Sequence, residues 1–530
     1  MPVTTSFPGV YVQELPSLVH TIAPAPTSVA VFVGYTHPFL TTQFLAAIPL
    51  FSFSDYQANF GGFFSSPWQP DYVGQAVFQF FGNGGPMCYV VGLPATEYYD
   101  SSATSKGQVA AASVAVPDAA PDITFTALQP VGIPAEAPAT GTVGIAMQVA
   151  ISNVQKTDAD DDTADIVVSY GSVVETYRKV LIGNLGSALA SSGLVSVTMS
   201  DPAPTAYPTT GSPFSLGYSS APEAGFTVIS PGDFGQVFAD NASLDKVPAF
   251  NLLAIPGISD PGVASEAVAY CERKRAFYIM DTPSSQTSGW DANSVVKDLA
   301  GGTALSPSPP VSVNAAAYYP WLQATDPVTQ QPAIVPPSGY VAGMYGQTDA
   351  AAGVWQSPAG IGTALLGTTG VDPLGVMTDP QQGVMNENAI DCLRQFPGVG
   401  TVVFGARTTA GADANTAQQQ WKYVAVRRTA LFIEQSLYAS LKWAVFQPNA
   451  TPLWNALTQE VSAFMLTLFR QNAFAGDTPS QAFLVQCDAT TTTPADVANG
   501  VVNILVGFAP LVPAEFVVIQ IAQLAGQAQS

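Results

Sequence analysis

The residues that could do chemistry are few and widely spaced in this chain. Its two histidines, His20 and His37, both stand near the N-terminus in loop-like contexts. No G-x-S-x-G nucleophile elbow and no phosphate-binding G-x-x-x-x-G-K-[ST] loop occurs. The "GVG" at 398–400 leads into a strand-like run instead of opening a helix, which indicates a turn and not a dinucleotide site. We therefore expect surface or hydrogen-bonded structural histidines and no enzyme, and a hydrolase whose carboxylates meet only in the folded chain stays open.

The acidic run "DADDD", Asp158 to Asp162, has the oxygen ligands that calcium prefers. It lacks the glycine and the distal glutamate of a calcium loop, so a solvated turn is the better interpretation. The run "ERKR" at 272–275 is interpreted as an exposed turn between a helix and a strand. We expect no metal and no cofactor.

One window departs from the acidic character of the chain. Residues 391–480 hold seven of the 16 basic residues and five acids, whereas the whole chain has a net charge of −22. The basic residues are Arg394, Arg407, Lys422, Arg427, Arg428, Lys442 and Arg470. They are either ordinary solvated helix faces or a docking surface for an acidic partner, whose complementary potential would set register and speed encounter.

The composition excludes several classes of protein. A net charge of −22 argues against nucleic-acid binding, which needs a basic stripe. Only 10% of the residues are charged, and weakly charged surfaces associate easily. The four cysteines (Cys88, Cys271, Cys392, Cys487) have no metal-ligand spacing and are expected to be reduced and buried, as in a protein made in the cytoplasm.

Targeting and membrane segments are not expected. The N-terminus has no basic stretch followed by an apolar one, so we predict no Sec signal. The apolar segment 500–525 contains Pro510, Pro513 and Glu515 near its centre, so we interpret it as two strands joined by a proline turn and not as a membrane span.

The elements that surround these residues indicate several domains. Apolar runs at 27–36, 72–93, 247–257 and 264–283 predict buried strands alternating with helices, as in an α/β layer. Residues 96–245 are rich in Ala, Ser, Thr, Pro and Gly with short alternating runs, which predicts a β-rich, peripheral insertion. The segments "AAAYYPWLQATDP" and "VPPSGYVAGMYGQTDAAAGVWQSPAG" have no strong period and are predicted to be loops and short helices.

Two late segments have clear helical periods. In 418–446, apolar residues step by three or four from Val426 to Ala444, which predicts one helix. Thr451, as the cap, and Pro452 predict the start of a second, antiparallel helix with a stripe from Leu457 to Leu468. Strands should follow, which makes the C-terminal part an α+β domain.

Several long motifs, in order, resemble contractile tail sheath proteins of phages and bacterial contractile injection systems. They are "PGVYVQELPS", "TSVAVFVGYT", "PPSGYVAGMYGQTDAAAGVWQSPAG", "FPGVGTVVFGART", "YVAVRRTALFIEQSLYASLKWAVFQPN", "PLWNALTQEVSAFMLTLFRQNAFAG" and "PAEFVVIQI". "MNENAIDCLR" departs from the family, which often has an Asn-Pro turn there.

The resemblance implies an α+β multidomain fold: mixed α/β core domains, a β-rich inserted domain, and arms that add strands to neighbouring subunits. The domains would be an N-terminal arm (1–22), a discontinuous middle α/β domain (23–95 and 246–375), the insertion (96–245), a C-terminal α+β core (376–510) and a C-terminal arm (511–530). The donated strands would be Gly9, Val10, Tyr11, Val12 and Gln13, and Phe516, Val517, Val518, Ile519, Gln520 and Ile521.

The implied function is that of a structural subunit that polymerises as stacked hexameric rings around an inner tube and contracts to drive the tube through an envelope. Its partners would be copies of itself, the inner tube protein, and baseplate and terminator or cap proteins, without nucleic acid or membrane insertion. The resemblance assigns Lys422, Arg427, Arg428 and Lys442 to docking on the inner tube. A β-rich adhesin or carbohydrate-binding protein is the alternative, supported by the Ser/Thr-rich insertion alone.

Overall fold

The structure is a computed structural model of the 530-residue chain. It describes residues 21–64, 70–94, 96–97, 107–108, 113–116, 123–131, 147–156, 162–202, 204–208, 212–216 and 231–518. The chain divides into two compact units, one of Pro26–Arg427 and one of Met1–Ala25 with Arg428–Ser530. The division falls inside helix α9 (Val424–Ser440).

An eight-stranded sheet forms the centre of the larger unit, and its six inner strands are parallel. The edge strands β2 and β20 run antiparallel to their neighbours. In order across the sheet the strands are β2 (Ala47–Leu50), β3 (Met87–Leu93), β1 (Val29–Tyr35), β13 (Leu252–Ala254), β14 (Phe277–Asp281), β15 (Ala315–Tyr319), β19 (Ile390–Phe396) and β20 (Gly400–Val403).

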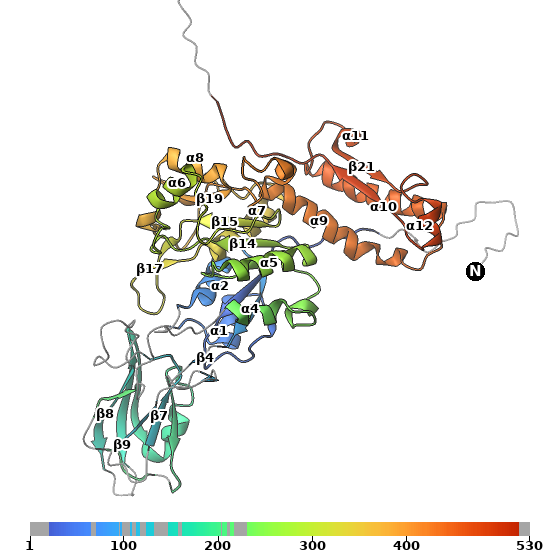
Figure 1. Cartoon of the computed structure of the whole chain (residues 1–530). Helices are drawn as coiled ribbons and strands as arrows, with labels where there is room; N and C mark the ends of the chain where they lie inside the picture. The colour runs from blue at the N-terminus through green and yellow to red at the C-terminus, as the bar shows by residue number, and fades with distance from the viewer. Residues whose placement is uncertain are drawn as a thin grey trace, which may run out of the picture. The chain divides into compact units, whose positions relative to one another are not determined.

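Helices cover both faces of this sheet, so its inner strands are buried (Figure 1). Val31 and Val33 on β1 belong to a cluster with α4 (Pro231–Phe238) and α5 (Pro261–Lys274). Phe32, which alternation directs to the other face, contacts Phe80 of α2 (Tyr72–Gly82) at 5.5 Å between ring centroids. The predicted strands at 27–36, 72–93, 247–257 and 264–283 and their helices are therefore confirmed.

The remaining helices and small sheets of the α/β part surround this frame. The helices are α1 (Phe53–Phe60), α6 (Ala292–Ala300), α7 (Ser338–Ala352) and α8 (Asp379–Glu387), with short 3₁₀ turns at Leu244–Lys246, Pro373–Gly375 and Thr416–Trp421. A three-stranded sheet has the order β17 (Pro332–Val335), β16 (Leu322–Thr325), β18 (Gly370–Val371).

The prediction of loops and short helices in the two aromatic segments was wrong. "AAAYYPWLQATDP" forms β15 and β16, and "VPPSGYVAGMYGQTDAAAGVWQSPAG" contains the 15-residue helix α7. Helix α7 buries Ser338 through Gly346 without interruption, so it shows no one-sided apolar stripe in the sequence. Two of its glycines, Gly339 and Gly343, pack against α2: a Cβ on Gly343 would lie 2.6 Å from the carbonyl oxygen of Phe80.

The described residues between 96 and 216 are mainly strands with their own apolar cluster. A four-stranded sheet has the order β10 (Val173–Leu181), β9 (Thr163–Tyr170), β8 (Met147–Gln155), β12 (Phe214–Leu216). A three-stranded sheet has the order β11 (Val195–Met199), β7 (Ile123–Ala127), β6 (Ser113–Ala115). The pair β4 (Thr96–Glu97) and β5 (Gly107–Gln108), a 3₁₀ turn at Ile182–Asn184 and helix α3 (Leu185–Ala188) complete this region. We call the described residues from 96 to 216 the β-rich region, and its status as an inserted domain stays a prediction.

The smaller unit combines helices with one small sheet. After α9 come a 3₁₀ turn (Leu441–Ala444), α10 (Thr451–Arg470), α11 (Pro479–Ala482), β21 (Phe483–Gln486), α12 (Pro494–Ala498) and β22 (Leu505–Phe508). The buried stripe of α10 from Leu457 to Leu468 is confirmed, but its N-cap is Ala450 and not Thr451. The predicted helix 418–446 is divided into two 3₁₀ turns and α9.

The boundary between the units differs from the predicted start of the C-terminal domain. Strands β19 and β20 lie in the sheet of the larger unit, which extends to Arg427, whereas the prediction began the C-terminal domain at residue 376. No helix in the described ranges has the length and apolar character needed to cross a membrane.

Candidate functional site

The β21–β22 sheet of the smaller unit has only two strands among the described residues. Its two antiparallel strands pair Phe483 with Phe508 through Gln486 with Leu505. On one face Phe483 and Phe508 lie near Phe474, with ring centroids 6.4 and 5.6 Å away. On the other face Leu484 and Leu505 are 53% and 51% exposed. A two-stranded sheet is only marginally stable by itself in water, so this one favours additional strands.

The edges of this sheet differ from those of the eight-stranded sheet. Each strand has one neighbour among the described residues, and neither strand contains a proline or a charged residue, the devices that discourage edge pairing. In the eight-stranded sheet, the edge strand β2 carries Pro49, and the outer side of β20 is covered by the segment 360–365. There Leu365 donates to the Thr401 carbonyl at 2.8 Å. Strand addition is therefore discouraged at the large sheet and open at the small one.

The predicted C-terminal donor segment begins just after β22. Residues 511–518 contain no helix or strand, and Phe516, Val517 and Val518 are 74%, 81% and 82% exposed. Of the two strands predicted within 500–525, β22 is present, and Ile519, Gln520 and Ile521 lie outside the described residues. Gly9, Val10, Tyr11, Val12 and Gln13 also lie outside them. Strand donation thus stays a prediction.

The smaller unit includes residues 23–25, which follow the predicted N-terminal arm. The N–H groups of Ala23 and Ala25 donate to the hydroxyls of Ser440 and Ser436 on α9, at 3.2 and 2.9 Å. The acceptor strands β21 and β22 were not among the residues singled out from the sequence. The signal that could have found β21 is the apolar run "FLV" after a proline-started turn, "TPSQA".

The four residues assigned to docking do not form one exposed surface. Lys422 and Arg427 belong to the larger unit, and Arg428 and Lys442 to the smaller one. Arg428 is 3% exposed, and Arg427 donates to Asn314 Oδ1 at 2.9 Å and lies over the Trp421 ring. Lys442 is exposed, with its amine 5.5 Å from the ring centroid of Tyr438. Lys442 is the one of the four whose side chain is exposed.

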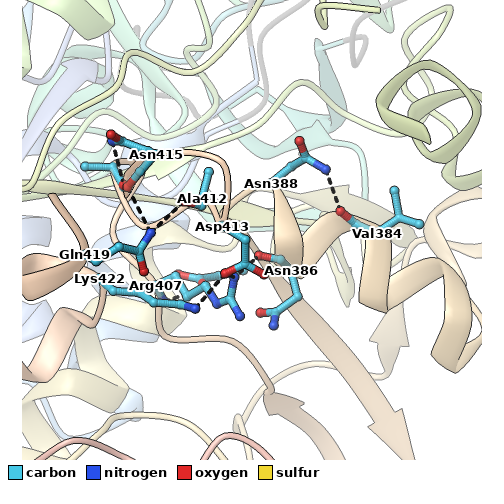
Figure 2. Close-up of polar contacts among 11 residues, drawn as sticks. Val384, Asn386, Asn388, Arg407, Ala412, Asp413, Asn415, Gln419 and Lys422 are labelled. Carbon is cyan, nitrogen blue, oxygen red and sulfur yellow. Dashed lines mark hydrogen bonds and ion pairs between the residues drawn. The ribbon is translucent and has the colours of Figure 1, made fainter. Parts of the chain in front are cut away.

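Lys422 takes part in a polar cluster with a buried arginine, Arg407, which is 1% exposed (Figure 2). Arg407 Nη1 donates to the Asn386 carbonyl at 2.7 Å and to Asp413 Oδ1 at 3.1 Å. Lys422 Nζ lies 2.7 Å from the same carboxylate oxygen. The hydrogen bond from Lys422 and the nearby Arg407 hold the pKa of Asp413 below its usual range. The cluster joins the end of α8 to the segment that leads into α9.

His37 and Asp162, two of the residues considered for chemistry, are buried and hydrogen-bonded. His37 is buried and hydrogen-bonded, and His20 lies outside the described residues. Asp162 is 6% exposed and accepts from the Tyr207 N–H, so the expected solvated turn does not hold for this residue. In the described ranges no three His, Cys, Asp or Glu side chains gather as metal ligands would. The four cysteines are free and buried, as predicted.

The crevice where open α/β sheets bind ligands is filled by the chain's own side chains. The strand order reverses between β1 and β13, and ligands of such sheets bind at the carboxyl ends of the strands beside that point. Gly34, Tyr72, Val73, Phe234 and Ile258 line this crevice, which has no room for a water molecule. A Cβ on Gly257 would lie 2.3 Å from the Tyr72 ring. The arrangement supports packing and not ligand binding.

Two family models match this chain, and together they cover about half of it. Residues 240–409 match the phage tail sheath protein central domain, and residues 416–523 match the phage tail sheath C-terminal domain. A protein named as a prophage major tail sheath protein of Pseudomonas aeruginosa (strain UCBPP-PA14) is 27% identical over 284 residues. The match covers 52% of this chain and 66% of that relative, just under two thirds of its length.

Solved structures share the fold over nearly the whole chain. The sheath of an extracellular contractile injection system, the PVC sheath complex in the contracted state, is 21% identical, with a TM-score of 0.56 and coverage of 98% of this chain and 99% of that one. The contracted helical sheath of the anti-feeding prophage is 22% identical, with a TM-score of 0.55 and coverage of 98% and 100%. A sheath tail protein from Desulfitobacterium hafniense is 13% identical, with a TM-score of 0.50 and coverage of 90% and 93%.

Proposed function

We propose that this chain, which belongs to the phage tail sheath family, is the structural subunit of a contractile sheath. It polymerises as stacked hexameric rings around an inner tube and contracts to drive the tube through a target envelope. Copies of the chain are its main partner, and the inner tube, baseplate and terminator proteins are the others. None of the proteins it is similar to favours the adhesin alternative.

The observation that carries this proposal is the two-stranded β21–β22 sheet together with the apolar tail that follows it. A sheet of two four-residue strands has backbone donors and acceptors directed outward at both edges. The exposed Phe516, Val517 and Val518 have the composition of a strand without a partner. β-augmentation between copies of the chain satisfies both needs at once.

Such exchange also explains an open polymer. Each donated strand adds about four or five backbone hydrogen bonds, at about 0.5–1.5 kcal/mol net apiece. The donor segments are the chain ends and the acceptor is the small sheet, so the contact is head-to-tail. A head-to-tail contact that does not close produces a helical filament. The subunit bodies can then rotate during contraction while the exchanged strands keep them connected.

Deletion of residues 1–15 tests strand exchange directly. We expect a folded chain, with the circular dichroism spectrum of the parent, that no longer forms striated tubes in negative-stain electron microscopy. A second variant replaces residues 9–13 by a Gly-Ser stretch of equal length. It keeps the length of the arm but removes the strand propensity, and it should also fail to assemble. Normal tubes from either variant would contradict the proposal.

A further inference from the structure

His37 lies where the carboxyl end of β1 meets the β-rich region. Its side chain is 0% exposed, and its Nε2 lies 3.0 Å from Oε1 of Gln129, which follows β7. The rings of Phe39 and Phe64 contact it, with centroids 5.9 and 5.1 Å away. The imidazole is therefore a polar contact between the α/β part and the β-rich region inside the larger unit.

The hydrogen bonds determine which ring nitrogen carries the proton. Nδ1 accepts from the backbone N–H groups of Phe39 and Leu40, at 3.1 and 3.2 Å. An atom that accepts two N–H groups has no hydrogen of its own, so the proton of the neutral ring is on Nε2 and is donated to Gln129. A second proton would have to enter at Nδ1, against both N–H donors. The second proton does not itself break the Nε2–H bond to Gln129, but it removes the two hydrogen bonds at Nδ1 that hold the ring in place, and the bond to Gln129 is lost when the ring moves.

None of the described residues in contact with the His37 ring carries a negative charge that would stabilise its protonated form. The described groups that contact the ring are Phe39, Leu40, Phe64, Gly61 and Gln129, and none of them is ionisable. The acids one contact further away are Asp71, which accepts from the Phe64 N–H, and Glu175, which accepts from the Gly193 N–H. Burial lowers the pKa of His37 to about 4 and raises the pKa of Asp71 to about 8, so Asp71 supplies no negative charge in acid.

Gln129 also forms a hydrogen bond within the β-rich region. Its Nε2 donates to the Gly193 carbonyl at 3.2 Å, and Gly193 is itself held by Glu175 of β10 at 3.0 Å. Among the described residues, further contacts between the two parts carry no charge. The Ser172 hydroxyl donates to the Val328 carbonyl at 3.0 Å, and Val328 and Phe63 pack in the apolar cluster of the β-rich region. Loss of the His37 hydrogen bonds would leave these neutral and apolar contacts between the two parts.

We propose that His37 is an acid-labile latch, whose protonation frees Gln129 and with it the β-rich region from the carboxyl end of β1. At a pH above this protonation the His37 ring is neutral and holds the β-rich region on the α/β part. Below it the ring leaves its seat, while the α/β core, with its own apolar clusters, stays folded. This inference is independent of strand exchange and of contraction.

The test measures the distance between the two parts in the full-length chain at two pH values. Spin labels are placed at Val174→Cys on β10 and Val311→Cys in the α/β part, which are 57% and 71% exposed, whereas the four native thiols are buried. The labelled chain is diluted with unlabelled chain, so that only distances within one chain are read by double electron–electron resonance. We expect a narrow distribution at pH 6 and a broad one at pH 3.5, with unchanged far-ultraviolet circular dichroism.

Two variants separate the latch from general acid sensitivity. His37→Asn keeps an acceptor near the place of Nδ1 but cannot take up a proton, so its distribution should be the same at both pH values. Gln129→Leu removes the held group and should be broad already at pH 6. The same broadening by acid in His37→Asn as in the parent, a narrow distribution in Gln129→Leu at pH 6, or unfolding of the whole chain before the distance changes would each overturn the proposal.

A direct titration guards against a variant that does not fold. The chain has two histidines, so His20→Gln leaves one imidazole signal in a nuclear magnetic resonance titration. We expect that signal to move with a midpoint near pH 4, about 2.5 pH units below an ordinary histidine. A midpoint near 6.5 would overturn the proposal independently of any distance measurement.

Discussion

Arg407 shows how one residue that looked like part of a docking surface serves the fold instead. Its guanidinium is buried and bonded to the Asn386 carbonyl and to Asp413, which also holds Lys422. A buried charge that loses a partner is strongly destabilising, because desolvation is no longer offset. In the sequence these residues were only members of a basic window, since nothing local reveals which cations are paired.

The first prediction concerns this cluster. Asp413→Asn should lower the free energy of unfolding of the larger unit by about 2 kcal/mol, the usual range for a lost hydrogen bond to a charged group. Asp477→Asn, a change of the same kind at an exposed acid, should alter it by less than about 0.5 kcal/mol. Urea denaturation followed by circular dichroism compares the two, and equal effects would show that the cluster does not stabilise the fold.

Asp71 provides a second prediction, for pH. The residue is 3% exposed and caps α2 through the Gly74 N–H at 2.8 Å, and burial raises its pKa from 3.8 to about 8. Between these values the folded chain keeps a proton that the unfolded chain releases, so stability is highest below about pH 4 as far as this group is concerned. It falls as the pH rises, by about 1.4 kcal/mol per pH unit at most, until about pH 8.

Asp71→Asn should remove this dependence. Asparagine is also a good N-cap and resembles the protonated acid, so the helix start is kept. Thermal unfolding at pH 5, 6, 7 and 8 should show the parent losing stability relative to the variant at each step. Parallel curves for the two proteins would mean that Asp71 is ionised in the folded chain.

At the scale of elements, α2 and α7 illustrate packing that the sequence conceals. Helix α7 approaches α2 so closely that side chains are excluded from Gly339 and Gly343, and the helix is buried on most sides. A helix buried all round lacks the one-sided period by which amphipathic helices are recognised. Glycine, poor in helix interiors by propensity, is required here because a neighbouring backbone occupies the place of a Cβ.

The third prediction compares two helical glycines. Gly343→Ala should destabilise the larger unit by about 1–3 kcal/mol, because its methyl group would lie 2.6 Å from the Phe80 carbonyl oxygen. Gly383→Ala in α8, where a Cβ meets nothing within 4 Å, should stabilise by about 0.4–1 kcal/mol. Calorimetric melting of both variants measures the difference, and a neutral Gly343→Ala would contradict the close approach of the helices.

At the scale of the whole molecule, we keep the proposal of docking on the inner tube for Lys442 alone among the four residues assigned to it. Arg428 is buried, Arg427 is bonded within the chain and Lys422 is ion-paired, so charge reversal at those sites would disturb folding as well as docking. Lys442 is exposed in the 3₁₀ turn that follows α9, and residues 435–459 around it contain no acid. A single exposed cation there, whose contact within the chain is with the Tyr438 ring, can meet an acidic partner.

Lys442→Glu is the fourth prediction. We expect a folded chain whose assembly on inner tubes is reduced at least tenfold in a pelleting assay, whereas Arg470→Glu, an exposed cation of the same unit, should assemble normally. Equal assembly of the two variants would remove Lys442 from the docking surface. A loss in both would point to net charge and not to a specific contact.

The sequence by itself determined the alternation of buried strands and helices in the α/β layer, the stripe of α10 and the buried thiols, because apolar periodicity and cysteine spacing are local signals. It also carried the family, because long motifs recur in order. Only the tertiary structure decided that β19 and β20 join the large sheet, that α7 is a helix, that Arg407 and Lys422 share one carboxylate, and that β21–β22 stands as a pair. These are properties of contacts between segments distant in the chain, and pairing, close approach and burial of charge leave no local trace from which they could be read.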